Sequence, residues 1–211
     1  MIKSNQTLLF IGDSVTDAYR DYGNPDDLGL GYVNMLATFM KLKWPEKDFK
    51  FYNRGINGHR LIDMERVWQE NCINLSPDLV TMLIGINDIW TYHHNYQTIE
   101  ANYWKDFYDR YSQLIKRTQV HNQAQVVLMK VFALPYPQDR VNWQQDIFLM
   151  NQLIDRLADE HNCITVELQS KLLSLGREYG YVLYTGNDGV HPTPLGHGII
   201  AQTWLKALGM F

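Results

Sequence analysis

The sequence predicts an α/β protein in which a mainly parallel sheet carries helices on both faces. Short apolar runs alternate with longer segments of helical periodicity, and this alternation is typical of repeated β-α units. The chain has 211 residues, and a single hydrophobic core usually serves up to roughly 250 residues, so we expect one domain over 1–211. Five of the short runs are the expected strands: Thr7–Ile11, Phe49–Tyr52, Leu79–Ile84, Gln125–Val131 and Ile164–Val166.

The clearest helix is expected over 142–162. Apolar side chains recur there at steps of four and three residues, which places them on one face of a helix. Stretches rich in Gly, Pro, Asn and Asp predict turns over 21–31, 134–140 and 176–194. Four further segments have helical patterns: Tyr32–Leu42, Asp63–Asn71, Ile99–Gln119 and Pro194–Leu208. Ligands of open α/β sheets bind beyond the carboxyl ends of the strands, so we look for a site in the loops that follow them.

The composition argues against several classes of protein. The chain is 45% hydrophobic and 20% charged, as in globular proteins, and no run approaches the ~18 apolar residues of a membrane-spanning helix. A net charge of −4 without a block of Lys and Arg argues against nucleic acid or an anionic membrane as partner. The first apolar run is too short for a signal peptide, so we expect a cytoplasmic protein. In a reducing compartment, Cys72 and Cys163 would stay small buried thiols without a disulfide.

Two segments far apart in the chain hold the residues of an activated nucleophile. Ser14 follows the first predicted strand in the turn Gly12–Thr16, where its side chain would lie at the carboxyl edge of the sheet. Asp188 and His191 share the loop before the last predicted helix. A carboxylate that orients an imidazole leaves the second ring nitrogen free to take a proton from a serine hydroxyl.

Two more loops supply candidate hydrogen-bond donors. Residues 53–58 follow the second predicted strand and include Gly58, and residues 85–88 follow the third and include Asn87. A glycine lets the backbone approach a ligand closely, and an Asn amide is a neutral donor suited to a tetrahedral oxyanion. Together with the backbone N–H of Ser14, these groups are the expected oxyanion hole.

Each signal alone has a simpler explanation. Ser14 could cap a helix, the Asp188–His191 segment could be a turn or half of a metal site, and each glycine loop could be an ordinary turn. The four segments occur together, each after a strand or before the last helix, and this combination favours catalysis. Adjacent side chains such as His93 and His94 diverge, so we expect no metal site there and no cofactor.

The motifs GDSVT, NRGINGHR, GINDIW and DGVHP resemble the ordered blocks of the SGNH hydrolases, also called GDSL-type esterases and lipases, over nearly the whole chain. The resemblance implies a three-layer α/β/α sandwich with a five-stranded sheet in flavodoxin-like order. It also implies a catalytic triad of Ser14, Asp188 and His191, and an oxyanion hole of Ser14, Gly58 and Asn87.

A closer likeness is to the intracellular SGNH acetylxylan esterases, which share the GxGY segment at 29–32 and the pattern of the last helix. This likeness implies a short acyl group on a carbohydrate alcohol, and a homo-oligomer. Two features depart from it: Asn187 stands where those esterases tend to carry Trp, and His59 and Arg60 follow Gly58 where small or polar residues are commoner.

The expected reaction is therefore ester hydrolysis through an acyl-enzyme at Ser14, with an acetylated sugar such as an acetylated xylo-oligosaccharide as substrate. Candidate contacts to that substrate are Asp13, Trp90 and Tyr184. Two alternatives stay open. One is a lysophospholipase or thioesterase of the same superfamily, and the other is a carbohydrate-binding protein without catalysis.

Overall fold

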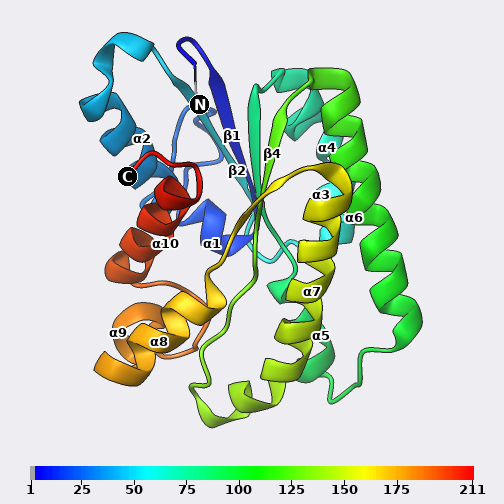
Figure 1. The fold of residues 1–211 in the computed structure, drawn as a ribbon. Coiled ribbons are helices and arrows are strands. Elements are labelled where there is room, and N and C mark those ends of the chain that lie inside the picture. Colours follow the sequence, from blue (N-terminus) through cyan, green and yellow to red (C-terminus); the bar gives the residue numbers. More distant parts are fainter. Residues whose placement is uncertain (1–2) are drawn as a thin grey trace.

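The computed structural model describes residues 3–211 and contains a five-stranded, entirely parallel sheet with helices on both faces (Figure 1). The strand order is β2-β1-β3-β4-β5. This is the flavodoxin-like order, so the predicted fold class is confirmed. The strands are β1 (Thr7–Gly12), β2 (Lys50–Gly55), β3 (Leu79–Leu83), β4 (Gln125–Met129) and β5 (Ile164–Val166).

Two hydrophobic clusters, one on each face of the sheet, form the core. Along β1, Leu9 and Ile11 belong to one cluster and Leu8 and Phe10 to the other, because successive strand side chains point to opposite faces. Both faces are covered, which explains why β1 and β3 are continuous apolar runs in the sequence rather than alternating ones.

Helices cover both faces of the sheet (Figure 1). On the first face lie α2 (Tyr32–Lys43), α8 (Gln169–Tyr179), α9 (Val182–Thr185) and α10 (Pro194–Ala207). On the second face lie α3 (Leu61–Arg66), α4 (Trp68–Asn71), α5 (Ile86–His94), α6 (Ala101–Asn122) and α7 (Gln144–His161). The single-turn helix α1 (Ser14–Asp17) follows β1, and three short 3-10 helices are η1 (Pro45–Lys47), η2 (Ile73–Leu75) and η3 (Gln138–Trp143). Within residues 3–211, no helix has the length and apolar character needed to cross a membrane.

The structure differs from the predicted elements at a local break and at a glycine. The helix expected over 63–71 is divided at Val67, whose φ and ψ of −102° and 6° are not helical. Residues 85–88, expected to be a loop, begin α5, because Gly85 at φ +127° lets the chain turn directly from β3 into the helix.

The stretch over 176–194 was expected to consist of turns, but it contains the end of α8 and all of α9. Gly176 lies inside α8 for a packing reason, since a Cβ there would come within 2.4 Å of the Tyr181 ring. The two cysteines were expected to be small buried thiols. Cys72 is buried in the core, and Cys163 packs against it.

Candidate active site

Ser14 is the first residue of α1 and lies at the carboxyl end of β1. Asp13 caps this helix, and its carboxylate accepts a hydrogen bond of 3.0 Å from the backbone N–H of Val15. A Cβ at Gly12 would come within 2.2 Å of the Leu83 carbonyl oxygen. The end of β1 therefore needs glycine so that the loops after β1 and β3 can approach each other.

Buried polar contacts hold α1 in place from behind. The side chain of Asn53 at the end of β2 donates to the Thr16 carbonyl at 2.7 Å, and the Thr16 hydroxyl hydrogen-bonds the Tyr32 hydroxyl at 3.0 Å. The backbone N–H of Tyr32 in turn donates to Nδ1 of His197 at 3.2 Å. Burial lowers the pKa of His197 to about 4, so this ring is a neutral acceptor near pH 7. These contacts explain the GxGY segment, for which sequence reasoning gave no structural role.

Ser14, His191 and Asp188 form one chain of hydrogen bonds. The Ser14 Oγ lies 2.9 Å from Nε2 of His191, and Nδ1 of His191 lies 2.5 Å from Oδ2 of Asp188. The other carboxylate oxygen of Asp188 accepts from the backbone N–H groups of Val190 and His191, both at 2.9 Å. This arrangement can deprotonate a serine hydroxyl, because the carboxylate fixes the tautomer that leaves Nε2 unprotonated.

The same contacts set the charges of the pair. Burial would raise the pKa of Asp188, but the hydrogen bonds from the His191 ring and from two backbone N–H groups outweigh it and lower the pKa. The hydrogen bond to Asp188 raises the pKa of His191 above its ordinary value, although partial burial opposes this shift. The Asp188 carboxylate would therefore stabilise an imidazolium at His191.

The segment between β4 and α7 braces the loop that carries Asp188, a role that the sequence did not reveal. The Nε of Arg140 donates to the Asp188 carbonyl at 3.0 Å, and the backbone N–H of Leu134 donates to the Gly189 carbonyl at 2.8 Å. Gly189 has φ +78°, and a Cβ there would lie 2.0 Å from the Tyr136 carbonyl oxygen. Arg140 is nearly buried, with its guanidinium carbon 4.6 Å from the Trp90 ring centroid.

The predicted oxyanion donors line one cavity of about 220 Å³ together with Ser14 and His191. Gly58 has φ +77°, and no atom lies within 4 Å of where its Cβ would be, so the space above its backbone is open. Asn87 sits in the first turn of α5, and its Nδ2 donates to the His59 carbonyl at 3.0 Å. This bond uses one of two amide hydrogens and leaves the other for a ligand.

Of the three predicted substrate contacts, the structure places Trp90 at this cavity and corrects the other two. Trp90 lines the cavity, and its ring centroid lies 6.1 Å from that of His191. Tyr184 is only 4% exposed because it packs in the core between the sheet and the α2-α10 layer. Asp13 is 1% exposed, because its carboxylate turns back to cap α1 and does not reach the cavity.

Asp13 and Asp88 are buried acids whose hydrogen bonds hold loops. Asp88 accepts hydrogen bonds from the backbone N–H of Leu61 at 3.2 Å and from the Tyr103 hydroxyl. Burial raises the pKa of Asp88 to about 6 and that of Asp13 to about 7. One carboxylate oxygen of Asp13 is buried without a hydrogen-bond partner, which accounts for the larger shift.

Replacing Asp13 with Asn is expected to stabilise the protein more at pH 8 than at pH 5. The folded-state pKa of Asp13, about 7, lies above the ordinary value of 3.8, so the cost of its buried charge is absent at low pH and complete above pH 7. Between pH 5 and pH 7 about two pKa units are at stake, which correspond to roughly 3 kcal/mol at most. Urea unfolding at both pH values measures the difference, with the exposed Asp159→Asn as control. Equal gains at both pH values would show that Asp13 does not titrate in this range.

The same variant should also move the activity profile. The negative charge of Asp13 raises the pKa of His191, so its removal should shift the acid limb of kcat/KM to lower pH. A limb that stays in place would mean that Asp13 is protonated throughout the titration of His191.

Of the remaining histidine and arginine candidates, His93 and Arg60 have side-chain partners. His93 Nε2 lies 2.8 Å from the Asp146 carboxylate, and the Arg60 guanidinium pairs with Asp63 at 3.2 Å. His94 lies at the end of α5 on the wall of another cavity. Across residues 3–211, no cluster of three or more His, Cys, Asp or Glu side chains is placed to hold a metal ion.

Comparisons with known proteins agree with this geometry. Residues 10–199 match the model of the GDSL-like Lipase/Acylhydrolase family. The chain is 29% identical to an acetylxylan esterase from Geobacillus stearothermophilus over 213 residues, which cover 99% of this chain and 96% of that protein. Among solved structures, a putative GDSL-like lipase from Parabacteroides merdae superposes with a TM-score of 0.91 at 29% identity, covering 100% of this chain and 99% of that one. Axe2, an acetylxylan esterase from G. stearothermophilus, superposes with a TM-score of 0.86 at 27% identity, covering 99% and 96%.

Proposed function

The chain belongs to the GDSL-like lipase/acylhydrolase family of carboxylic ester hydrolases, and on this basis we propose that it removes acetyl groups from carbohydrate esters such as acetylated xylo-oligosaccharides. The observation that carries the proposal is the hydrogen-bonded chain from Ser14 through His191 to Asp188. The similarity to an acetylxylan esterase supports the choice of substrate.

The geometry supports a two-step reaction. Ser14 Oγ attacks the ester carbonyl carbon while His191 Nε2, 2.9 Å away, takes its proton. His191 then donates that proton to the departing alcohol, and the acyl group stays on Ser14. In the second step His191 takes a proton from water, the hydroxide attacks the acyl carbon, and Ser14 leaves with the proton.

The oxyanion formed in each step would be held by the backbone N–H groups of Ser14 and Gly58 and by the Asn87 amide. We therefore expect Asn87→Ala to lower kcat by roughly 10² to 10³, because the developing negative charge loses one donor. The hydrogen bond from Asn87 to the His59 carbonyl is only partly buried, so the fold should persist without it. Steady-state kinetics with p-nitrophenyl acetate, together with thermal unfolding, measure both effects. A kcat within threefold of the wild-type value would remove Asn87 from the mechanism.

A second cavity of similar size supports a short acyl group. On the side of α1 and Pro192, a cavity of about 240 Å³ touches Ser14 and His191. Its other lining residues mix apolar and polar side chains, in contrast to the long apolar channel that a fatty acyl chain favours: Asp17, Ala18, Tyr19, Asn57 and His197. We assign the acetyl group to this cavity.

The experiment that tests the function compares three substrates of the wild-type protein. We expect acetate release from acetylated xylo-oligosaccharides, and faster turnover of an acetyl ester than of the octanoyl ester of the same alcohol. Faster octanoyl turnover would favour a lysophospholipase or thioesterase. Cleavage of p-nitrophenyl acetate without acetate release from any sugar ester would keep the esterase and reject the carbohydrate substrate.

The proposal includes self-association into a homo-oligomer, which rests on the resemblance to the acetylxylan esterases. Between residues 92 and 104, Tyr92, Tyr103 and Trp104 pack against the core. Tyr96, by contrast, is 99% exposed. Light scattering measures the mass in solution, and a monomer at micromolar concentration would contradict this part.

A further inference from the structure

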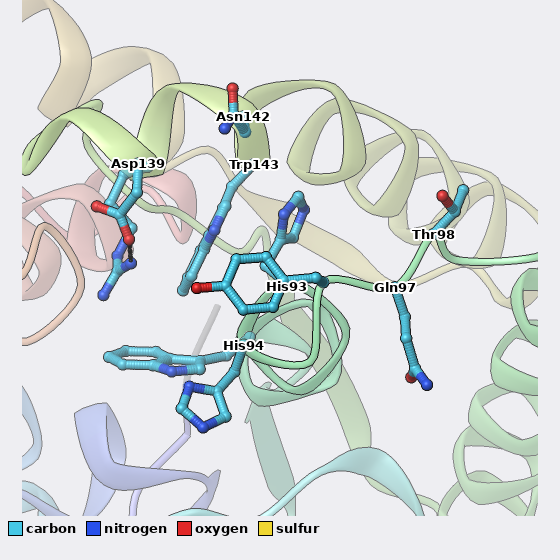
Figure 2. Close-up of a pocket in the computed structure, with 10 residues that line it drawn as sticks. His93, His94, Gln97, Thr98, Asp139, Asn142 and Trp143 are labelled. Atoms are coloured by element: carbon cyan, nitrogen blue, oxygen red, sulfur yellow. Dashed lines mark hydrogen bonds and ion pairs between the residues drawn. The ribbon is translucent and has the colours of Figure 1, made fainter.

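A cavity beside the active site lies between α5 and η3 and has a volume of about 580 Å³ (Figure 2). One wall comes from the end of α5 and the segment after it, including His94, Gln97 and Thr98. The other comes from Asp139 to Trp143 of η3. In the view of Figure 2, Trp143 lies between Asp139 and His93. A volume of this size falls in the range of small-molecule sites.

This cavity adjoins the catalytic one through a single shared side chain. Trp90 lines both the cavity of Ser14, Gly58 and Asn87 and the cavity at η3. A substrate whose ester lies on Ser14 therefore needs to pass only the Trp90 indole to reach the second cavity. The space is also too large and too polar for an acetyl group, so its natural occupant is part of the alcohol.

The inner wall is a rigid stack of rings and a guanidinium. The Arg140 guanidinium carbon lies 4.0 Å from the Trp143 ring centroid, and the His93 ring stacks on Trp143 at 5.4 Å with an interplanar angle of 25°. Trp90 meets Trp143 edge to face at 5.2 Å. A wall held in this way needs little rearrangement to receive a ligand, which favours binding.

Tyr96 stands at the rim of the cavity in a conformation that a tyrosine rarely adopts. Its φ is +54°, at the first position beyond the α5 cap, where glycine is usual. Its N–H donates to the His93 carbonyl at 3.2 Å, and the N–H of Gln97 donates to the Tyr92 carbonyl at 2.9 Å, which closes a Schellman motif. With 99% of its surface exposed, the ring contributes almost no burial to the fold. A strained, exposed aromatic residue at a cavity points to function rather than stability.

The chemistry of the lining suits a neutral polyhydroxylated ligand. The one guanidinium, on Arg140, is paired with the Asp139 carboxylate, so these charges cancel. The side chains of Gln97, Thr98 and Asn142 form no hydrogen bond within residues 3–211, so their donors and acceptors are available to hydroxyl groups. Aromatic faces beside free amides and hydroxyls are what a sugar ring requires.

We propose that the cavity between α5 and η3 binds the sugar residue next to the acetylated one in an oligosaccharide substrate, with Tyr96 packing on its ring. This inference rests on the proposed function, because it identifies the alcohol of the ester as part of a longer carbohydrate. It makes Tyr96 a residue that selects for chain length and takes no part in the acyl transfer.

The kinetic test compares acetylated methyl xyloside, acetylated xylotriose and p-nitrophenyl acetate as substrates. The wild type should have a higher kcat/KM for acetylated xylotriose than for acetylated methyl xyloside. Tyr96→Ala should lower the trisaccharide value about three- to tenfold, the range expected for one aromatic contact, and leave the other two unchanged. The matched control is Tyr179→Ala, which removes another exposed tyrosine at a site that lines none of these cavities, and it should change none of the three.

A wild type without preference for the trisaccharide, or a Tyr96→Ala variant that slows all three substrates equally, would overturn the proposal. A change in the solution mass of Tyr96→Ala would also overturn it, because it would assign the ring to a contact between copies of the chain.

A binding measurement separates failure of this inference from failure of the proposed function. Calorimetry of unacetylated xylotriose with Ser14→Ala should give a Kd that Ser14→Ala/Tyr96→Ala weakens about three- to tenfold. If the wild type releases no acetate from sugar esters but this difference is seen, the proposed function fails and the sugar site stands. If acetate is released but xylotriose binds both variants equally or not at all, the function stands and the site fails.

Discussion

Replacing Ser14 with alanine is expected to lower kcat for p-nitrophenyl acetate by about 10⁶-fold and to leave only the residual catalysis of the oxyanion hole and of binding. The variant loses the oxygen that would attack the ester, while His191, Asp188 and the backbone donors keep their positions. Removing the nucleophile of a catalytic triad lowers kcat about as much as removing all three residues. Binding of the substrate should survive, since the cavities on both sides of Ser14 are lined mainly by other residues.

The measurement is single-turnover kinetics with a parallel labelling experiment. A fluorophosphonate should label the wild type at Ser14 and leave Ser14→Ala unlabelled, because only an activated serine reacts. Ser174→Ala, an exposed serine of α8, serves as control and should keep full activity and labelling. Turnover that persists in Ser14→Ala would place the nucleophile elsewhere. A wild type that neither reacts nor turns over would reject the esterase and favour the alternative without catalysis.

Asp188→Asn is expected to lower kcat by about 10⁴-fold with little change in structure. In the wild type, one carboxylate oxygen accepts two backbone N–H groups and the other faces Nδ1 of His191. The Asn oxygen must occupy the first position, because an amide nitrogen cannot accept from an N–H. The amide nitrogen then donates to Nδ1, which moves the ring proton of His191 to Nε2. The base therefore faces Ser14 with a hydrogen and cannot take its proton.

Nitrogen-15 NMR of the histidine rings reports this exchange of tautomers directly, beside the kinetics. Asp139→Asn is the matched control, because it changes a carboxylate on the same side of the molecule without a contact to His191. A loss of less than tenfold in Asp188→Asn would mean that another group orients the imidazole.

The sheet and the positions of its strands were predictable from the sequence. Buried parallel strands appear as continuous apolar runs, and β5 was predicted to the residue because Ile164–Val166 is flanked by a helical pattern and by polar residues. The helix α7 was equally clear from its apolar spacing. The helices α5 and α8 were missed because Gly85 and Gly176 suggest turns, whereas the first makes a tight strand-helix junction and the second makes room for a ring.

For the site, the sequence identified the residues of the predicted triad and oxyanion hole. It did not identify the residues that hold the loops carrying them. Ser14, His191 and Asp188 could be predicted because each belongs to a short motif at the end of an element. Tyr184 was misassigned because an aromatic side chain near a catalytic loop is equally suited to the core. Arg140 could not be found at all: its contact with the Asp188 carbonyl joins residues 48 positions apart, and no local pattern marks it.

The order of the strands places the acyl-transfer residues and the cavity for the alcohol on different parts of the sheet. Selection can therefore change the choice of alcohol without changing acyl transfer. Ser14, Gly58 and Asn87 follow the adjacent strands β1, β2 and β3, whereas η3 follows β4 and lies one strand further along the sheet. Exchange of η3, or of the segment after α5, would alter which alcohols fit and leave the acyl-transfer step intact. Arg140 is the exception, since it touches both the Asp188 loop and the cavity wall. A substitution of Arg140 would change both the turnover rate and the choice of alcohol. Substitutions elsewhere in η3 can change the choice of alcohol alone.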